Sequence, residues 1–267
     1  MSRPRTYATE AVILRRADYG EADRMLTLMT PGMGKLRVMA KGARKITSRK
    51  AGHIDLFMRS QLLLAQGRTF DIVTQADLID SHRELREDVL RMSYAHYLSE
   101  LADQFAQEGQ EDTRLYGLLV DGLNRLSTAP DPRLAVRYFE MQLLSATGYR
   151  PGLFKCASTG QPLEADQNID ATGTADGERT RTFTAWSPQV GGVLTQAAGR
   201  LVRDASPLSY SALLLLRALQ TQSFETLAAL DVTPEAHEQA ERAMQRYMTY
   251  VLERTLKSVQ FLRQLQR

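Results

Sequence analysis

The fold of the first third of this chain is decided by one stretch, Lys35-Leu36-Arg37-Val38-Met39-Ala40-Lys41. Charged and apolar side chains alternate along it, and successive side chains of a β-strand point to opposite faces of the sheet. A period of two places Lys35, Arg37 and Lys41 on one face and small apolar side chains on the other. The stretch therefore predicts a strand that packs on a core with one face and offers positive charge to a partner with the other.

Four neighbouring segments have the apolar and β-branched composition of short strands. These segments are Thr9–Arg16, Arg24–Met29, Leu62–Ala65 and Phe70–Val73. Proline and glycine within residues 30–34, and Gly67 between the last two segments, supply the fixed and positive φ values that chain reversals need. Five short strands within about 75 residues suit a small closed barrel of the oligonucleotide-binding (OB) kind.

From Ser81 onward, apolar side chains recur every three or four residues, as they do along the buried side of a helix. Ser81-His82-Arg83-Glu84 has the spacing of a capping box, which predicts the start of the first helix. The buried stripe expected behind it comprises Leu85, Val89, Met92, Leu98, Leu101 and Phe105. Further helices are expected from near Asp112, from Pro132 (after an Asp131 N-cap) to Gly148, over Ser209–Gln222, and from Thr233-Pro234-Glu235 to about Leu265.

The helical pattern is interrupted at residues 149–199. The middle of this segment, residues 166–181, is rich in Gly, Thr and Asp and predicts a long exposed loop, while its flanks predict a small β-hairpin knob. The whole chain is expected to be an α+β protein in which an N-terminal OB-fold β-barrel packs on an α-helical bundle. The predicted domains are 1–80 (OB fold, nucleic-acid binding), 81–149 (first part of the helical domain), 150–199 (insertion) and 200–267 (C-terminal part of the helical domain).

Positive charge is concentrated near the N-terminus. Residues 1–50 hold twelve Lys and Arg against four acidic residues, a balance of +8 within a chain total of +3, which leaves −5 for residues 51–267. No acidic residue lies between Pro31 and Ile54. A cationic head on a mildly acidic body predicts a polyanionic partner for the head. The alternative is an ordinary solvated surface that is rich in Lys and Arg.

The cations of this region form the predicted nucleic-acid site. Single strands bind OB folds through a cationic groove and aromatic platforms, and contacts to phosphates give affinity without sequence readout. Tyr7, Tyr19 and Phe57 are candidate platforms, with a place in the barrel core or rim as the alternative for each. The predicted DNA-binding residues are Arg15, Arg16, Lys35, Arg37, Lys41, Arg44, Lys45, Arg49 and Lys50.

Three classes of motif are absent from the sequence: those of enzymes, of membrane spans and of secretion. The run Gly32-Met33-Gly34-Lys35 lacks the spacing and the hydroxyl of a phosphate-binding Walker loop. A metal-dependent nuclease that uses Asp71, Asp77 and Asp80 is the enzyme alternative. We expect no catalytic activity, no cofactor and no metal. The single cysteine, the absence of an apolar run of membrane-spanning length and the absence of a signal peptide predict a cytoplasmic protein without membrane contact.

Three groups of residues, each short, occur in a specific order along the chain. They are residues 20–28 with 34–35, 41–45 and Ser48; residues 137–140 with 143–144 and 148–149; and Cys156, Gly160 and Phe183 with residues 187–188 and 191–192. Through these groups the chain resembles the RecO family of bacterial recombination mediators over essentially its whole length. The resemblance implies an N-terminal OB fold, a helical domain and a zinc-finger-like insertion, in agreement with the patterns above.

The insertion departs from the pattern of many relatives, in which two Cys-x-x-Cys pairs hold zinc. The corresponding positions here are Cys156, Thr159, Thr195 and Ala198. One thiolate remains, no histidine lies in the insertion, and tetrahedral zinc needs four ligands. We therefore predict a degenerate insertion without zinc, with Cys156 as a small buried apolar residue. The side chains expected to hold the knob by packing are Phe154, Phe183 and Trp186.

The resemblance also implies a function in DNA repair and homologous recombination. A member of this family is expected to bind single-stranded and also double-stranded DNA at the bacterial nucleoid, to anneal complementary strands, and to assist RecA loading with RecR on DNA coated by single-strand-binding protein (SSB). The acidic C-terminal tail of SSB would need a basic groove. The candidate residues for partner binding are Arg133, Arg137, Arg217, Arg254 and Lys257, each of which could instead lie on a solvated helix face. The alternative function is an OB-fold RNA-binding or assembly factor without annealing activity.

Overall fold

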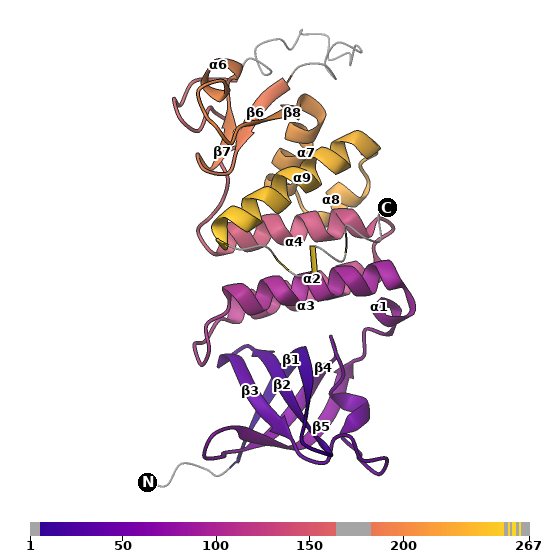
Figure 1. Cartoon of the computed structure of the whole chain (residues 1–267). Helices are drawn as coiled ribbons and strands as arrows, with labels where there is room; N and C mark the ends of the chain where they lie inside the picture. The colour runs from indigo at the N-terminus through magenta and orange to yellow at the C-terminus, as the bar shows by residue number, and fades with distance from the viewer. Residues whose placement is uncertain (1–5, 164–182, 254–255, 257, 260–261, 263–267) are drawn as a thin grey trace. The chain divides into compact units, whose positions relative to one another are not determined.

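Two compact units make up the chain in the computed structural model, which describes residues 6–163, 183–253, 256, 258–259 and 262 (Figure 1). The first unit is formed by residues 1–128 together with residues 257–267, and the second by residues 129–256. The boundary between them falls inside the segment 81–149, which the sequence pattern assigns to a single part of the helical domain.

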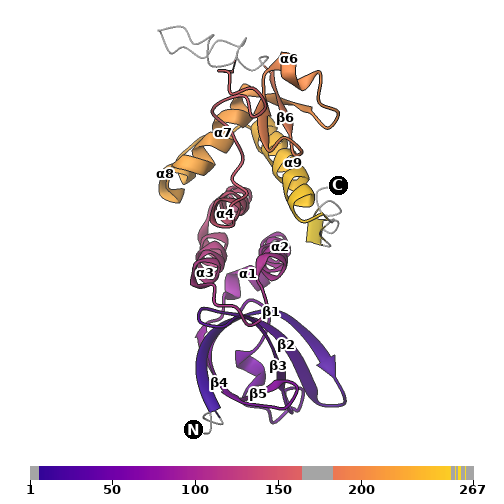
Figure 2. The same cartoon turned by 90° about the vertical axis from the view of Figure 1, so that its left-hand side faces the viewer.

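The first unit begins with a closed five-stranded barrel, seen end-on as a ring in Figure 2. Its strands are β1 (Thr6–Tyr19), β2 (Asp23–Thr30), β3 (Gly34–Ala40), β4 (Arg59–Ala65) and β5 (Asp71–Asp80). They close in the order β1-β2-β3-β5-β4, and every pair is antiparallel except β3 with β5. Strand β1 pairs with β4 through its first half and with β2 through its second. The predicted α+β class and the OB-like barrel are confirmed.

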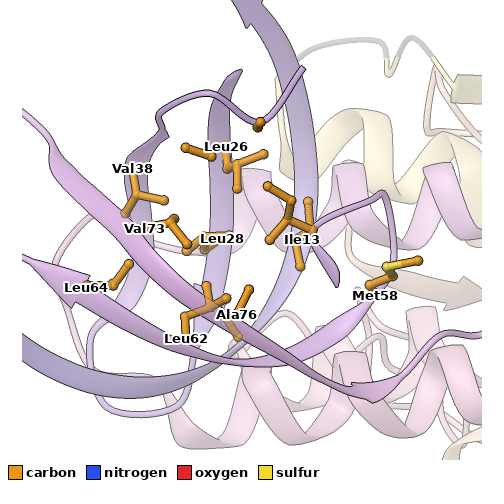
Figure 3. Close-up of a cluster of buried hydrophobic side chains, with 13 residues drawn as sticks. Ile13, Leu26, Leu28, Val38, Met58, Leu62, Leu64, Val73 and Ala76 are labelled. Atoms are coloured by element: carbon orange, nitrogen blue, oxygen red, sulfur yellow. The ribbon is translucent and has the colours of Figure 1, made fainter. Parts of the chain in front are cut away.

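Alternate apolar side chains of the strands fill the barrel interior (Figure 3). Leu26 and Leu28 of β2 are fully buried there, and Val38 of β3 packs against them within the same cluster. Ala40 is also buried, whereas Arg37 is exposed. The alternation along residues 35–41 therefore has the predicted inward and outward faces. The strand itself ends at Ala40, so that Lys41 is the first residue of the following loop.

Three helices complete the described core of the first unit: α1 (Arg83–Glu87), α2 (Val89–Phe105) and α3 (Thr113–Thr128). Helix α2 contacts β1, and α3 contacts β2. The predicted stripe is buried at Leu85, Leu98 and Leu101. Val89 departs from it, with 58% of its surface exposed, because Asp88 breaks the helix and starts α2 by accepting hydrogen bonds from two backbone N–H groups.

The capping box predicted at Ser81 is wrong. His82 occupies the N-cap position of α1 in the left-handed conformation, at φ 43°, and no side chain caps this end. The imidazole is buried, with Nδ1 3.0 Å from the carbonyl oxygen of Phe57 and Nε2 3.0 Å from Oδ1 of Asn124. His82 therefore links the barrel loop to α3, and this tertiary contact outweighs the local capping preference.

The second unit combines helices with a small sheet. Its helices are α4 (Pro132–Ala146), α6 (Gln196–Gly199), α7 (Tyr210–Thr221), α8 (Phe224–Ala228) and α9 (Pro234–Val251), and its sheet has the order β7 (Gly192–Leu194), β6 (Phe183–Ser187), β8 (Ser206–Ser209). Asp131, Ser209 and Thr233 cap α4, α7 and α9 with their side chains, as predicted for the first of these helices. Helix α9 ends at Val251, so its predicted end near Leu265 is wrong. The loop predicted over residues 166–181 lies outside the described residues.

Candidate nucleic-acid interface

A basic row crosses the outer face of the barrel. Arg15 of β1 is in register with Thr27 of β2, and Thr27 is in register with Arg37 of β3. Side chains that face each other across neighbouring strands lie on the same surface of the sheet. The two arginines therefore flank Thr27 on the surface of strands 2 and 3, which is the face that OB folds use for oligonucleotides.

An apolar row lies beside the basic row, two residues along each strand. Ala17, Met25 and Met39 are in register across β1, β2 and β3, and Met39 is in register with Ile72 of β5. Met25, Met39 and Ile72 are half-buried, so part of each side chain remains open to a ligand. We call the two rows together the outer barrel face, comprising Arg15, Ala17, Met25, Thr27, Arg37, Met39 and Ile72.

The loop that follows β3, residues 41–50, is named here the basic loop, and it is fixed to the β1–β2 turn. Gly42 adopts a positive φ of 66°, and its N–H donates to Oδ1 of Asp23 at 2.8 Å. The backbone N–H of Arg44 donates to the carbonyl oxygen of Ala22 at 2.9 Å. These residues belong to the first group that carries the resemblance, and their contacts give the loop a defined shape next to the outer barrel face.

Three predicted DNA-binding cations are engaged by carboxylates. Lys35 Nζ lies 3.3 Å from Oδ1 of Asp103 and donates to its backbone carbonyl at 2.7 Å. Arg15 pairs with the same carboxylate at 2.7 Å, and Arg16 pairs with Asp55 at 2.8 Å. Lys35 is mostly buried by this contact, so its charge serves the junction between β3 and α2 rather than an open surface.

Two cations of the basic loop are also engaged. Arg44 pairs with Asp18 at 3.4 Å, and Lys50 donates from Nζ to the carbonyl oxygen of Val73 at 2.8 Å. Burial lowers the pKa of Lys50, against a smaller opposing effect of Asp23. Both side chains therefore anchor the loop to the barrel. Among the described residues, no side-chain hydrogen bond or ion pair engages the remaining four predicted cations, which are exposed: Arg37, Lys41, Lys45 and Arg49.

The three candidate stacking platforms occupy different environments. Tyr19 is 52% exposed at the end of β1. Phe57 is buried, with its ring 4.8 Å from that of His96, so it is a core residue and not a platform. Tyr7 is half-buried and donates its hydroxyl to Asp71 at 2.5 Å. Ile46 in the basic loop, which no sequence pattern singles out, is fully exposed and adds an apolar side chain between the cations.

The three described arginines proposed for partner binding lie in the second unit, and each is engaged. Arg137 is buried and pairs with the buried Glu140 at 2.9 Å, so its place on a partner-binding surface is wrong. Arg133 pairs with its own N-cap residue, Asp131, at 3.1 Å. Arg217 donates to the carbonyl oxygen of Leu153 at 2.8 Å. Arg254 and Lys257 lie outside the described residues.

The insertion brings the four positions of the family's zinc ligands together. Cys156 Sγ lies 3.9 Å from Oγ1 of Thr195, and the Thr195 hydroxyl accepts from the N–H of Ala198. Cys156 is buried, as predicted. Burial raises the pKa of its thiol, but hydrogen bonds with the Ser158 and Thr159 side chains and with backbone groups lower it to about 6. Hydroxyl and methyl groups thus stand where three of the four zinc-binding thiolates would be.

The packing of the knob differs in part from the prediction. Trp186 is fully buried, with its ring 5.6 Å from that of Tyr247. Phe154 is 49% exposed and instead lies against the guanidinium of Arg217, 5.1 Å from the ring centre, so its predicted place in the knob core is wrong. The side chain of Phe183 lies outside the described residues. No group of three or more potential metal ligands occurs in the described part of the chain.

The sequence was compared with models of known protein families and with known proteins. The family model for the N-terminal part of recombination protein O matches residues 1–82, and the model for its C-terminal part matches residues 86–260. The chain belongs to the RecO family. A DNA repair protein RecO from Roseiflexus sp. (strain RS-1) is 39% identical over 97% of this chain and 86% of its own length. The corresponding protein of Desulforudis audaxviator is 35% identical over 97% of both chains, and one from Dehalococcoides mccartyi strain BAV1 is 32% identical over 98% and 97%.

Membership of the RecO family bears on the function class. The family functions in DNA repair and recombination and has no catalytic activity, which confirms the prediction that this chain is not an enzyme and removes the nuclease alternative. Among the residues that the structure describes, no helix is long and apolar enough to cross a membrane.

Proposed function

We propose that this chain is a cytoplasmic recombination mediator that binds single-stranded DNA, and duplex DNA as well, with its outer barrel face and basic loop, and that anneals complementary strands. The observation that carries the proposal is the group of four exposed cations without partners in the described structure, Arg37, Lys41, Lys45 and Arg49, beside an apolar row. In this arrangement the cations contact phosphates, while the methionines, Ile46 and Tyr19 contact the bases.

Annealing follows from the same arrangement. Two DNA strands repel each other because both carry a negative charge on every phosphate. A fixed surface of cations lowers this repulsion. Apolar contacts with the bases prevent each strand from pairing with itself. The basic loop is anchored at both ends by Arg44 and Lys50, so its free cations are presented on a defined scaffold.

The proposal extends to partners through the family. RecR, the acidic C-terminal tail of SSB and, indirectly, RecA are the proposed partners in loading the recombinase onto coated DNA. Arg133 and Arg217 remain proposed contacts for the acidic tail, since each is in part accessible in the second unit.

The experiment compares DNA affinity and annealing in matched variants of the full chain. Lys41→Ala with Lys45→Ala removes two free cations of the basic loop, and Lys155→Ala with Arg203→Ala removes two exposed cations of the second unit. We expect the first variant to bind a labelled single-stranded oligonucleotide about tenfold or more weakly, and to anneal complementary strands more slowly, while the control behaves as the unmodified protein. Equal loss in both variants would contradict the proposed site.

The alternative function, an RNA-binding or assembly factor, makes a different prediction in the same assay. Single strands of identical sequence in DNA and RNA form are offered in competition, and annealing of the DNA pair is followed in parallel. Preferred binding of RNA without annealing of DNA would favour the alternative. Binding of DNA with annealing supports the proposed mediator function.

A further inference from the structure

A cavity of about 310 Å³ lies in the second unit between the small sheet and α9. The side chains of Trp186, Gln239, Arg242 and Arg246 line it, together with apolar groups that include Pro207 and Ala243. No acidic side chain is among its described lining residues. The cavity therefore offers hydrogen-bond donors and positive charge on an apolar wall.

The indole of Trp186 is the most informative part of this wall. The residue is fully buried, and its Nε1–H has no hydrogen-bond partner in the described structure. A buried donor without a partner costs stability, so a native structure that retains one calls for an explanation such as an acceptor supplied by a ligand. The Nε1 atom has no accessible surface, so an acceptor in the cavity would reach it only with a movement of the cavity wall.

Gln239 and Arg246 hold fixed positions around the same cavity. The Oε1 atom of Gln239 accepts from the backbone N–H of Ser209 at 2.8 Å, which leaves its amide N–H₂ group to donate. Arg246 donates at 2.6 Å to the hydroxyl of Ser206 and at 2.6 Å to the carbonyl oxygen of Asp204. A guanidinium has five N–H groups, so donors remain after these two bonds.

Arg242 is an exposed charge at the cavity. It is 66% exposed, and its only described ion pair is a long one to the equally exposed Glu238, at 3.7 Å. An exposed pair of this kind contributes little to stability, so Arg242 can turn toward a ligand at small cost.

We propose that this cavity binds a phosphate group. Its two charged donors, Arg242 and Arg246, come from α9, and Gln239 of the same helix adds an amide group. A phosphate presents three or more acceptor oxygens to donors that approach from different directions, and guanidinium groups bind it readily. The remaining volume and the apolar wall leave room for a sugar or base attached to the phosphate. The site is separate from the outer barrel face, and its existence does not depend on the DNA-binding function proposed above.

The test uses Trp186 as its own reporter, because it is the only tryptophan of the chain. Inorganic phosphate is titrated into the full-length protein while tryptophan fluorescence is followed, with sodium chloride at matched ionic strength as the reference and acetate as the carboxylate probe. We expect a saturable change with phosphate that neither chloride nor acetate reproduces. A response to phosphate no greater than that to chloride or acetate would overturn the proposal.

Variants locate the response. Arg242→Gln should weaken phosphate binding about tenfold while leaving the thermal unfolding transition unchanged, since its ion pair is exposed. Arg203→Gln, an exposed arginine of the same unit outside the cavity lining, is the matched control and should bind as the unmodified protein. Equal phosphate affinity in all three proteins would overturn the assignment even if a fluorescence change occurs.

A second titration distinguishes the sources of the phosphate. A single-stranded oligonucleotide is added in place of inorganic phosphate. A fluorescence change that Arg242→Gln weakens identifies a nucleic-acid strand as a ligand of the cavity, whereas a response to inorganic phosphate alone identifies a free anion. Lys41→Ala with Lys45→Ala removes only cations of the basic loop. If this variant loses DNA binding but keeps its phosphate response, the two sites are separate.

Discussion

The cations of the first fifty residues differ in whether the fold engages them in ion pairs or leaves them exposed. Lys35 is mostly buried against Asp103, where its ammonium bridges β3 and α2. Lys45 is exposed in the basic loop, and its side chain has no polar partner among the described residues. The two lysines are close in the sequence and equal in charge, yet the structure assigns them separate roles in stability and in binding.

This difference predicts opposite phenotypes for two single substitutions. Lys35→Ala should lower the free energy of unfolding by about 1–2 kcal/mol and change DNA affinity little, because Asp103 loses one of its two cationic partners. Lys45→Ala should leave stability unchanged and weaken DNA binding by about threefold to tenfold. Denaturant unfolding and oligonucleotide titration measure the two effects, and a shared phenotype would argue against the assignment.

Asp131 connects the start of α4 with α9. Its Oδ2 lies 3.2 Å from Nε2 of His237 and 3.1 Å from the Arg133 guanidinium. Burial by itself raises the pKa of the Asp131 carboxyl. The hydrogen bonds from His237 and Arg133 together outweigh this effect, so the net pKa lies well below the ordinary range. The carboxylate therefore stabilises the fold above its unfolded pKa, and this contribution is lost as the pH falls through the folded pKa.

A pH series of Asp131→Asn tests this linkage. Asparagine keeps the N-cap hydrogen bond but not the charge. The difference in unfolding free energy between the unmodified protein and the variant should be largest above about pH 5 and should shrink as the pH falls below about 4. A difference that stays constant across this range would show that the charge of Asp131 does not stabilise the fold.

Among the elements of the fold, the start of β3 depends on a glycine. Gly34 has a φ of 56°, and a Cβ at this position would lie 1.9 Å from the carbonyl oxygen of Gln110. The following residue, Lys35, exchanges backbone hydrogen bonds with Gln107 and Gly109. The turn between β2 and β3 therefore packs directly on the backbone that joins α2 to α3, and only a residue without a side chain fits there.

Paired substitutions separate conformation from close approach. Gly20 has the same φ of 56° in the β1–β2 turn, but a Cβ there meets nothing within 4 Å. Gly20→Ala should cost about 1 kcal/mol through backbone conformation alone, whereas Gly34→Ala should cost about 2 kcal/mol or more because the backbone must also move. Chemical denaturation gives both values, and equal costs would contradict the close packing.

Elements with a strong local signal could be predicted from the sequence. The strand at residues 35–41 follows from alternation, and the N-cap at Asp131 follows from its own side chain and the proline after it. The left-handed His82 could not be predicted, because its contacts with Phe57 and Asn124 override the local preference. The break at Asp88 interrupts an apolar period that continues through it in the sequence. The end of α9 at Val251 was also missed, since the sequence beyond it remains helical in composition.

Across the whole molecule, the sequence locates the basic region but not which of its charges are free. Nine cations are expected in the DNA site, and the partners that engage five of them lie up to 88 residues away in the chain, as Asp103 does from Arg15. The sequence around Asp103, Asp55 and Val73 contains no pattern that indicates these contacts. The apolar row of Met25, Met39 and Ile72 depends on strand register, which a single sequence specifies weakly.

The salt dependence of single-strand affinity tests the central claim most directly. Each phosphate contact on single-stranded DNA changes the slope of log K against log salt by about −0.7, so four free cations predict a slope near −2.8 for the unmodified protein. Lys41→Ala with Lys45→Ala should reduce it to about −1.4. An unchanged slope in the double variant would show that the barrel and its basic loop do not hold the DNA backbone.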